Sequence, residues 1–264
     1  MSDLACHPSA VLSDGSFDLF VKHSAAADAE RQFTIEQASL DFLSRRAGVH
    51  VPVPIAVVPV PDGTLFVAEA LEPIARGPTE WREMGRTLAR IHAVKGERFG
   101  FHTDTYFGPI LQDNSPTDNW AAFYVEQRLR PSLRLAIDSG NIPATVAGQV
   151  ESVINRFPDL VNEEATPALL HGDAQQNNFI STSEGAYVID PAVYYGNREI
   201  DLALVDYFQP VPDELFKGYR EVLPIPMGFA ERRDLWRICG YLACVAVEGA
   251  DYLDRLTGAL QPCL

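Results

Sequence analysis

LLHGDAQQNNFI, at residues 169–180, combines an aspartate with several amides in the loop that follows an apolar run. Asp173 stands three residues after that run, and Asn178 stands five residues beyond Asp173. A second aspartate, Asp190, follows another short apolar run, and a turn at 183–185 separates the two segments. This pattern is typical of a β-hairpin whose arms each lead into a polar loop. We therefore expect the three oxygen-bearing side chains to lie close together.

These side chains suit phosphate chemistry. Carboxylate and amide oxygens are ligands that Mg²⁺ accepts in proteins, usually beside phosphate oxygens of a substrate. An aspartate that does not bind the metal can accept the proton of a hydroxyl group during phosphoryl transfer. We expect Asp173 to be this base, and Asn178 and Asp190 to bind the metal. A tight turn capped by Asp173 is the alternative for His-Gly-Asp alone, and the two further oxygen ligands disfavour it.

Two residues near this loop are expected to be structural. His171 precedes the proposed base, which already fills the proton-accepting role, so we expect its imidazole to brace the loop. Asp201 is expected to cap a helix or brace a loop, because it lies in the polar-apolar run REIDLAL at 198–204.

Composition narrows the class of protein. The chain has 264 residues, 47% of them hydrophobic, which is enough for one large domain or two lobes. Its 36 acidic and 21 basic residues give a net charge of −15, which disfavours nucleic acid as a partner. The N-terminus has no basic region followed by an apolar run, and no segment reaches the roughly 18 apolar residues of a membrane span. We therefore expect a cytoplasmic protein with no membrane partner.

The sequence pattern changes near residue 75. Residues 17–24 predict a strand, 34–48 a helix, and 51–71 two extended segments joined by a Pro-Asp-Gly turn, with prolines that suit an edge strand. Helical periodicity then dominates, at 80–94, 119–140, 145–160, 213–223 and 231–260. The sequence predicts an α+β fold of two lobes. A small antiparallel sheet with one helix occupies 1–74, and a larger, mainly helical lobe occupies 75–264.

Longer runs carry a family resemblance. HGDAQQNN with the later VIDP resembles the catalytic loop and metal-binding segment of aminoglycoside phosphotransferase-like kinases, within the protein-kinase-like superfamily. VIDPAVYYGNREIDLAL, at 188–204, is similar to a segment of the fructosamine kinase, or ketosamine-3-kinase, family. FGFHTDTYFGPILQDNSPTDNWAAFYVEQRL, at 99–129, resembles the same family. The resemblance extends from about residue 17 onward.

The resemblance implies a function and further site residues. It implies an ATP- and Mg²⁺-dependent kinase that phosphorylates a hydroxyl of a fructosamine or ribulosamine, free or on a glycated protein or peptide, as in protein deglycation. It implies that Lys22 binds the nucleotide phosphates and that Glu36 holds this lysine. The backbone around Glu69 and Leu71 would bind adenine.

Three residues lie in the segment that resembles the family's substrate side: Trp120, Glu126 and Arg128. An indole wall and nearby carboxylates would suit a protonated amine that carries a sugar. Trp120 on a helical face also fits a plain core position, so both interpretations stay open.

The sequence also leaves alternatives. Before Lys22 the chain has almost no room for the strand and the glycine-rich loop that the family has there, and it has one glycine, Gly15, where the family has several. We therefore expect a nucleotide-binding lobe shortened at its start, an altered nucleotide lid and weak ATP binding. Another small alcohol or an aminoglycoside remains an alternative acceptor, and a catalytically silent pseudokinase is a different class of protein. A metal-dependent phosphohydrolase is disfavoured, because such sites hold two metals. The natural substrate, the phosphorylated position, the oligomeric state and the role of Cys6 stay open.

Overall fold

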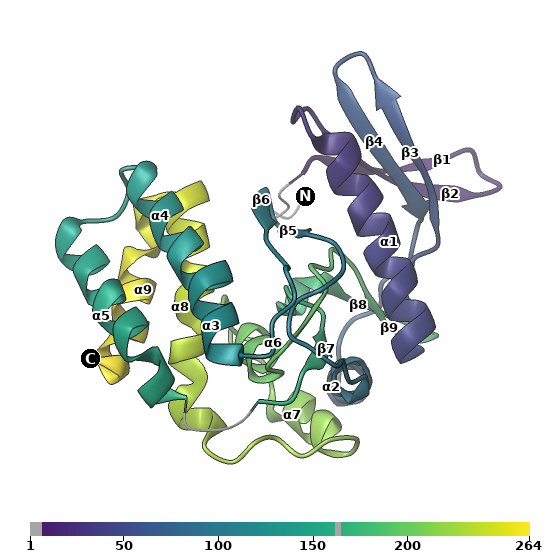
Figure 1. Cartoon of the computed structure of the whole chain (residues 1–264). Helices are drawn as coiled ribbons and strands as arrows, with labels where there is room; N and C mark the ends of the chain where they lie inside the picture. Colours follow the sequence, from purple (N-terminus) through teal and green to yellow (C-terminus); the bar gives the residue numbers. More distant parts are fainter. Residues whose placement is uncertain (1–6, 162–164) are drawn as a thin grey trace.

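The computed structural model describes residues 7–161 and 165–264. These residues form a small antiparallel sheet with a helix beside it and a larger, mainly helical part (Figure 1). The sheet has the strand order β1-β2-β4-β3. The strands are β1 Ser9–Ser13, β2 Asp18–Ser24, β3 Pro54–Val60 and β4 Gly63–Glu69, and the helix beside them is α1 Ala29–Ala47. The predicted two-lobe α+β architecture is confirmed, whereas the boundary at residue 74 stays a prediction.

The two edge strands of the sheet, β1 and β3, differ in whether the sequence predicted them. β3 pairs with β4 alone, so its prolines lie on an edge strand, as predicted. β1 contradicts the expectation that the chain has almost no room for a strand ahead of Lys22; all five of its residues are exposed, so no buried apolar face marks it in the sequence. It is held by backbone pairing with β2, from Ser9 opposite Lys22 to Ser13 opposite Asp18. The lysine strand therefore lies inside the sheet.

Helix α1 connects the two lobes. Phe33 and Leu40 pack against Phe66 of the sheet, whereas Leu43 joins the main core of the helical lobe. The helix begins five residues before the predicted start and ends at Gly48, whose backbone is left-handed with φ 63°. This end was predicted, because glycine adopts that conformation without a steric penalty.

The helical lobe contains α2 Pro78–Ala93, α3 Trp120–Tyr124, α4 Arg130–Asp138, α5 Ala144–Leu160, α6 Glu199–Leu204, α7 Asp213–Arg220, α8 Phe229–Val247 and α9 Leu253–Leu260. A π-helix, Val125–Leu129, joins α3 to α4. The single helix predicted at 231–260 is wrong, because Gly249, with φ 110°, separates α8 from α9. Helices α2 and α7 pack with their backbones in close approach: a Cβ on Gly85 would lie 2.0 Å from the Leu215 carbonyl oxygen.

Short strands support the loop at 171–178. β7 Ala168–Leu170 pairs with β10 Tyr194–Gly196, and β8 Phe179–Thr182 pairs with β9 Gly185–Val188. The predicted hairpin is therefore confirmed only for β8 and β9. The apolar run before His171 belongs to a different pair, because its partner strand comes after the second polar loop. A further hairpin, β5 Thr105–Phe107 with β6 Ile110–Gln112, lies between α1 and the helical lobe (Figure 1).

Two further observations concern the described residues. None of their helices is both long and apolar enough to cross a membrane. Cys239, Cys244 and Cys263 are free thiols, and Cys6 lies outside the described residues.

Candidate active site

The loop after β7 turns sharply at Gly172. Its φ is +84°, and a Cβ there would lie 2.0 Å from the carbonyl oxygen of Ala192. Any side chain at this position would therefore collide with the backbone of the segment that follows Asp190. Glycine lets the two polar loops lie against each other, which brings Asp173 and Asp190 to the same cavity.

Asp201 holds this turn from behind. Its Oδ2 accepts a hydrogen bond of 2.7 Å from the His171 backbone N–H, and its Oδ1 one of 3.1 Å from Gly172. The His92 ring contacts Asp201 Oδ2 through Nε2 at 3.0 Å, and its Nδ1 lies 2.9 Å from the Tyr219 hydroxyl. The carboxylate is fully buried. The expected bracing role of Asp201 is confirmed.

His171 braces the loop from inside. Its Nε2 lies 3.0 Å from the carbonyl oxygen of Ile189, to which it must donate, so its Nδ1 is the acceptor for the Asp173 N–H at 3.3 Å. Burial lowers the pKa of His171, which keeps the ring neutral. The imidazole thus links the two polar loops, in agreement with the structural role expected for it.

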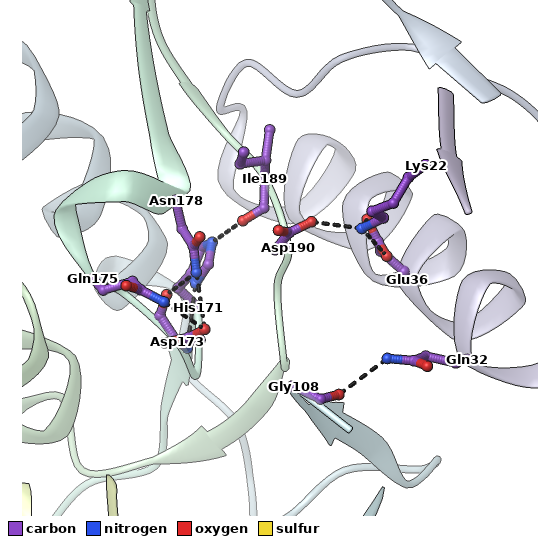
Figure 2. A network of polar contacts seen from close by, with 10 residues as sticks. All are labelled: Lys22, Gln32, Glu36, Gly108, His171, Asp173, Gln175, Asn178, Ile189 and Asp190. Atoms are coloured by element: carbon purple, nitrogen blue, oxygen red, sulfur yellow. Dashed lines mark hydrogen bonds and ion pairs between the residues drawn. The ribbon is translucent and has the colours of Figure 1, made fainter. Parts of the chain in front are cut away.

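Asp173 is held by two amides. Asn178 Nδ2 donates to the Asp173 backbone oxygen at 2.8 Å and to its carboxylate at 2.9 Å (Figure 2). Gln175 Nε2 donates to the same carboxylate at 3.3 Å. Burial raises the pKa of Asp173 to about 7, although both hydrogen bonds oppose this shift. A carboxylate with such a pKa can take up a proton near neutral pH, which suits a general base.

Lys22 joins the sheet to the second polar loop. Its Nζ lies 2.7 Å from both carboxylate oxygens of Glu36 and 2.7 Å from Asp190 Oδ1 (Figure 2). Lys22 is buried, whereas the Asp190 side chain is 48% exposed. Asp190 also has a positive φ of 52°, which costs energy for a residue with a side chain and is typical of functional sites.

The charges of this trio depend on one another. Burial alone would lower the pKa of Lys22, but the two carboxylates outweigh it and raise that pKa. Burial raises the pKa of Glu36 to about 7, although Lys22 opposes the shift. Partial burial also favours a higher pKa for Asp190, but the Lys22 ammonium outweighs it and leaves that pKa below its usual value. One ammonium therefore serves two carboxylates, and Asp190 stays ionised.

Two adjoining cavities meet at these residues. One of about 260 Å³ is lined by Lys22, Glu36, Asp173, Asn178 and Asp190, together with groups from α1 and the β5–β6 hairpin. The other, of about 180 Å³, has a mainly apolar lining that includes Val11, Phe20, Leu40, Phe66, Ala68, Glu69, Ala70, Leu71, Ile180 and Ile189. Glu36 and Asp190 border both. Together they offer an apolar slot that opens onto a charged chamber.

The donors in the charged chamber fit magnesium. Asn178 uses its amide N–H groups on Asp173, and its Oδ1 makes none of the described hydrogen bonds. Asp190 supplies an ionised carboxylate that is partly open to the cavity. Among the described residues, no group of three or more His, Cys, Asp and Glu is placed to hold a metal by itself. A metal here would therefore need oxygen ligands from a bound substrate as well.

None of the three expected substrate residues lines the cavity that holds Asp173, and their substrate role stays a prediction. Trp120 is buried in the core against Phe99 and Trp236, and it does not line the cavity that holds Asp173. Glu126 is 62% exposed and pairs with Arg130 at 2.9 Å. Arg128 is buried against the rings of Phe123 and Tyr194, as described below. Four residues that line this cavity were not found from sequence, namely Gln32, Tyr106, Gly108 and Gln175. Of these, Gln175 had a local signal, its position two residues after Asp173.

Comparison with known proteins agrees with this geometry. A family model described as fructosamine kinase matches residues 5–264. The chain belongs to the fructosamine kinase family. It is 33% identical to a probable ketoamine kinase of Synechocystis sp. over 259 residues, which covers 96% of this chain and 85% of the relative. A probable ketoamine kinase of Klebsiella aerogenes is 32% identical, with 95% of this chain and 86% of the relative covered.

Solved structures show the same fold. A candidate fructosamine-3-kinase from Thermobifida fusca is 31% identical, with a TM-score of 0.83 over 97% of this chain and 93% of that one. A thermostable mutant of the aminoglycoside phosphotransferase APH(4)-Ia is 12% identical, with a TM-score of 0.63 over 97% of this chain and 92% of that one, and shares the fold alone. This member of the fructosamine kinase family is therefore a phosphotransferase that acts on an alcohol group, and its kinase-like fold implies the use of ATP.

Proposed function

We propose that this kinase transfers the γ-phosphate of ATP to a hydroxyl group of a low-molecular-weight ketosamine, a fructosamine or ribulosamine, as in protein deglycation. The observation that carries the proposal is the meeting of Asp173, Asn178, Asp190 and the Lys22–Glu36 pair in one cavity. The names of the relatives, probable ketoamine kinases at about 30% identity, support the choice of acceptor.

Each residue has a role in this proposal. Asp173 accepts the proton of the acceptor hydroxyl. The oxygen of that hydroxyl bonds to the γ-phosphorus, and the bond between the γ-phosphorus and the oxygen that leaves with ADP breaks. Lys22 binds phosphate oxygens, and Glu36 keeps its ammonium in place. Asn178 and Asp190 would hold magnesium, which neutralises charge on the phosphates when bound.

The apolar cavity suits the adenine of ATP. Phe20 and Phe66 of the sheet and Leu40 of α1 line it, together with Ile180 and Ile189. Such a slot can accept a flat ring between aliphatic and aromatic side chains. Backbone groups from Glu69 to Leu71 lie along the same cavity and would provide polar contacts to the ring. The expectation of weak ATP binding, based on the glycine-poor segment before Lys22, stays a prediction.

The lining of the charged chamber favours a sugar over a polyamine. Its described carboxylates are Glu36, Asp173 and Asp190, and the proposed mechanism uses all three. The remaining polar side chains are mostly neutral and include Ser9, Gln175 and Asn177. Neutral donors and acceptors suit sugar hydroxyls, whereas an aminoglycoside with several ammonium groups needs additional carboxylates. The cavity therefore fits a single sugar-amine better than kanamycin.

A substrate comparison tests the proposal. The wild-type protein is incubated with ATP and Mg²⁺ and with fructosyl-lysine, ribulosyl-lysine, a glycated peptide, choline or kanamycin, and both ADP and the phosphorylated acceptor are measured. We expect product with the ketosamines and little with kanamycin or choline, and none with Asp173→Asn. Kanamycin turned over as well as fructosyl-lysine would overturn the ketosamine assignment. Nucleotide binding without turnover of any acceptor would indicate a pseudokinase.

A further inference from the structure

Helix α1 carries three polar side chains at four-residue intervals. Asp28, at its N-terminal boundary, Gln32 and Glu36 therefore lie along one face of the helix. Asp28 makes no capping hydrogen bond to the helix backbone, although aspartate at this position usually does. Its carboxylate instead accepts a hydrogen bond of 2.7 Å from the hydroxyl of Tyr106 in β5. The N-terminal end of this face of α1 is thus attached to the helical lobe through β5.

A second contact lies one turn further along. Gln32 Nε2 donates to the carbonyl oxygen of Gly108, in the turn between β5 and β6, at 3.0 Å (Figure 2). Gln32 and Tyr106 are both buried. Burial and then the hydrogen bond to Asp28 raise the pKa of Tyr106 to about 12, so the phenol keeps its proton and remains a donor at neutral pH. Both contacts join the same two elements, α1 and the β5–β6 hairpin.

The hairpin is itself anchored in the helical lobe. Asn114 Nδ2 donates to Thr105 Oγ1 at 2.9 Å, and Asn114 Oδ1 accepts from Arg128. The Arg128 guanidinium is 2% exposed and lies 4.8 Å from the Phe123 ring centre and 4.3 Å from that of Tyr194. Contact with both rings and the hydrogen bond to Asn114 hold the guanidinium in place. The hairpin is therefore firmly attached to the helical lobe and can hold α1 in place.

The two ends of α1 contact the helical lobe in different ways. Near its C-terminal end, Leu43 is part of the main core, and the Phe42 ring lies 5.0 Å from that of Phe101. At its N-terminal end, the polar contacts of Asp28 and Gln32 reach the hairpin. Glu36, which holds Lys22, lies between these two attachments. The position of its carboxylate therefore depends on both.

We propose that the β5–β6 hairpin is a clasp that holds the N-terminal half of α1 against the helical lobe, and that Tyr106 and Gln32 are positioning residues for the Glu36–Lys22 pair. The catalytic part of this inference rests on the proposed function, because it takes Lys22 as the phosphate-binding group. The mechanical part does not, because it concerns only the attachment of α1.

Hydrogen exchange tests the attachment. Tyr106→Phe removes one hydroxyl and leaves the ring. Tyr187→Phe is the matched control, since that hydroxyl donates to Glu184 at the same distance of 2.7 Å, three residues away along the chain. We expect faster backbone amide exchange at residues 29–36 in Tyr106→Phe, in Gln32→Leu as an independent variant, and not in the control. Unchanged exchange at 29–36 in both Tyr106→Phe and Gln32→Leu would overturn the clasp, whether or not the protein is a kinase.

Kinetics test the positioning role. We expect Tyr106→Phe to lower kcat about tenfold, which corresponds to about 1.4 kcal/mol of activation free energy. In a Glu36→Ala background the same substitution should cause no further loss, because the group that it positions is absent. Tyr187→Phe should keep wild-type kcat. An additive loss in the Glu36→Ala background would overturn the positioning role. If the wild type turns over no acceptor, the proposed function fails and the exchange result alone decides the clasp.

Discussion

Asn178 holds Asp173 with its amide nitrogen, while its amide oxygen makes none of the described hydrogen bonds. Nδ2 lies 2.8 Å from the backbone oxygen of Asp173 and 2.9 Å from its carboxylate. The same side chain therefore orients the proposed base and opposes the rise of its pKa, and in the proposed function it would also supply a metal ligand. These functions are coupled, so one substitution should alter both the pH dependence and the metal dependence of the reaction.

For Asn178→Ala we expect a higher magnesium requirement and an acidic limb of the pH–kcat profile that moves to higher pH. The wild-type limb should lie near pH 7, because activity needs ionised Asp173, whose pKa is about 7. Removal of the donor raises that pKa further, so the loss of activity should be greatest below pH 7. Titration of kcat with magnesium at several pH values measures both effects. A normal magnesium requirement would contradict the metal role of Asn178.

Asp173→Asn should abolish turnover, leave nucleotide binding near wild type and stabilise the protein at high pH. The pKa of Asp173 is raised from 3.8 to about 7 on folding, so between these values the folded state binds more protons than the unfolded state. Wild-type stability therefore falls as pH rises through this window, by about 1.4 kcal/mol per pKa unit of difference. Asparagine carries no charge, so its gain in Tm should be small at pH 4 and largest above pH 7. A Tm gain that does not depend on pH would show that ionisation of Asp173 is not the cause.

Lys22→Met and Glu36→Ala should damage the same step. Each removes one member of a pair joined by two contacts of 2.7 Å, and the glutamate acts by placing the lysine. The double variant should then be no slower than the slower single variant. Measured kcat values for the three variants check this, with ATP at saturating concentration. Losses that multiply would mean that the two residues act independently.

Trp120→Phe should lower stability without changing acceptor recognition. The indole is buried against Phe99, Phe123, Tyr124 and Trp236, so a smaller ring leaves a cavity in the core. We expect a lower Tm, an unfolding free energy reduced by about 1–3 kcal/mol, and an unchanged KM for a ketosamine. A selective rise of that KM with no change in Tm would restore the indole as a wall of the acceptor site.

The local chemistry of the site was predictable from sequence, because its residues follow one another closely in the chain. Asp173 and Asn178 belong to one loop, and Asp190 follows strand β9 of the β8–β9 hairpin that comes next. Their spacing in the chain was therefore enough to predict that they lie together. The family resemblance assigned Lys22 on a strand and Glu36 on the following helix as a pair, and their contact of 2.7 Å agrees with that expectation. Family resemblance added the nucleotide and the acceptor class, which spacing does not provide.

Tertiary structure decided what local patterns leave undetermined. The apolar run before His171 could pair with either later strand, and it pairs with Tyr194–Gly196 because Gly172 allows the two polar loops to pack together. Trp120 lies at a helical spacing that suits a core or a binding wall equally, and only the rings of distant segments assign it to the core. The contact of Tyr106 with Asp28 joins residues 78 positions apart. Hydrophobic periodicity records which face of an element is buried and not what covers that face, so contacts between distant segments appear only when the chain is folded.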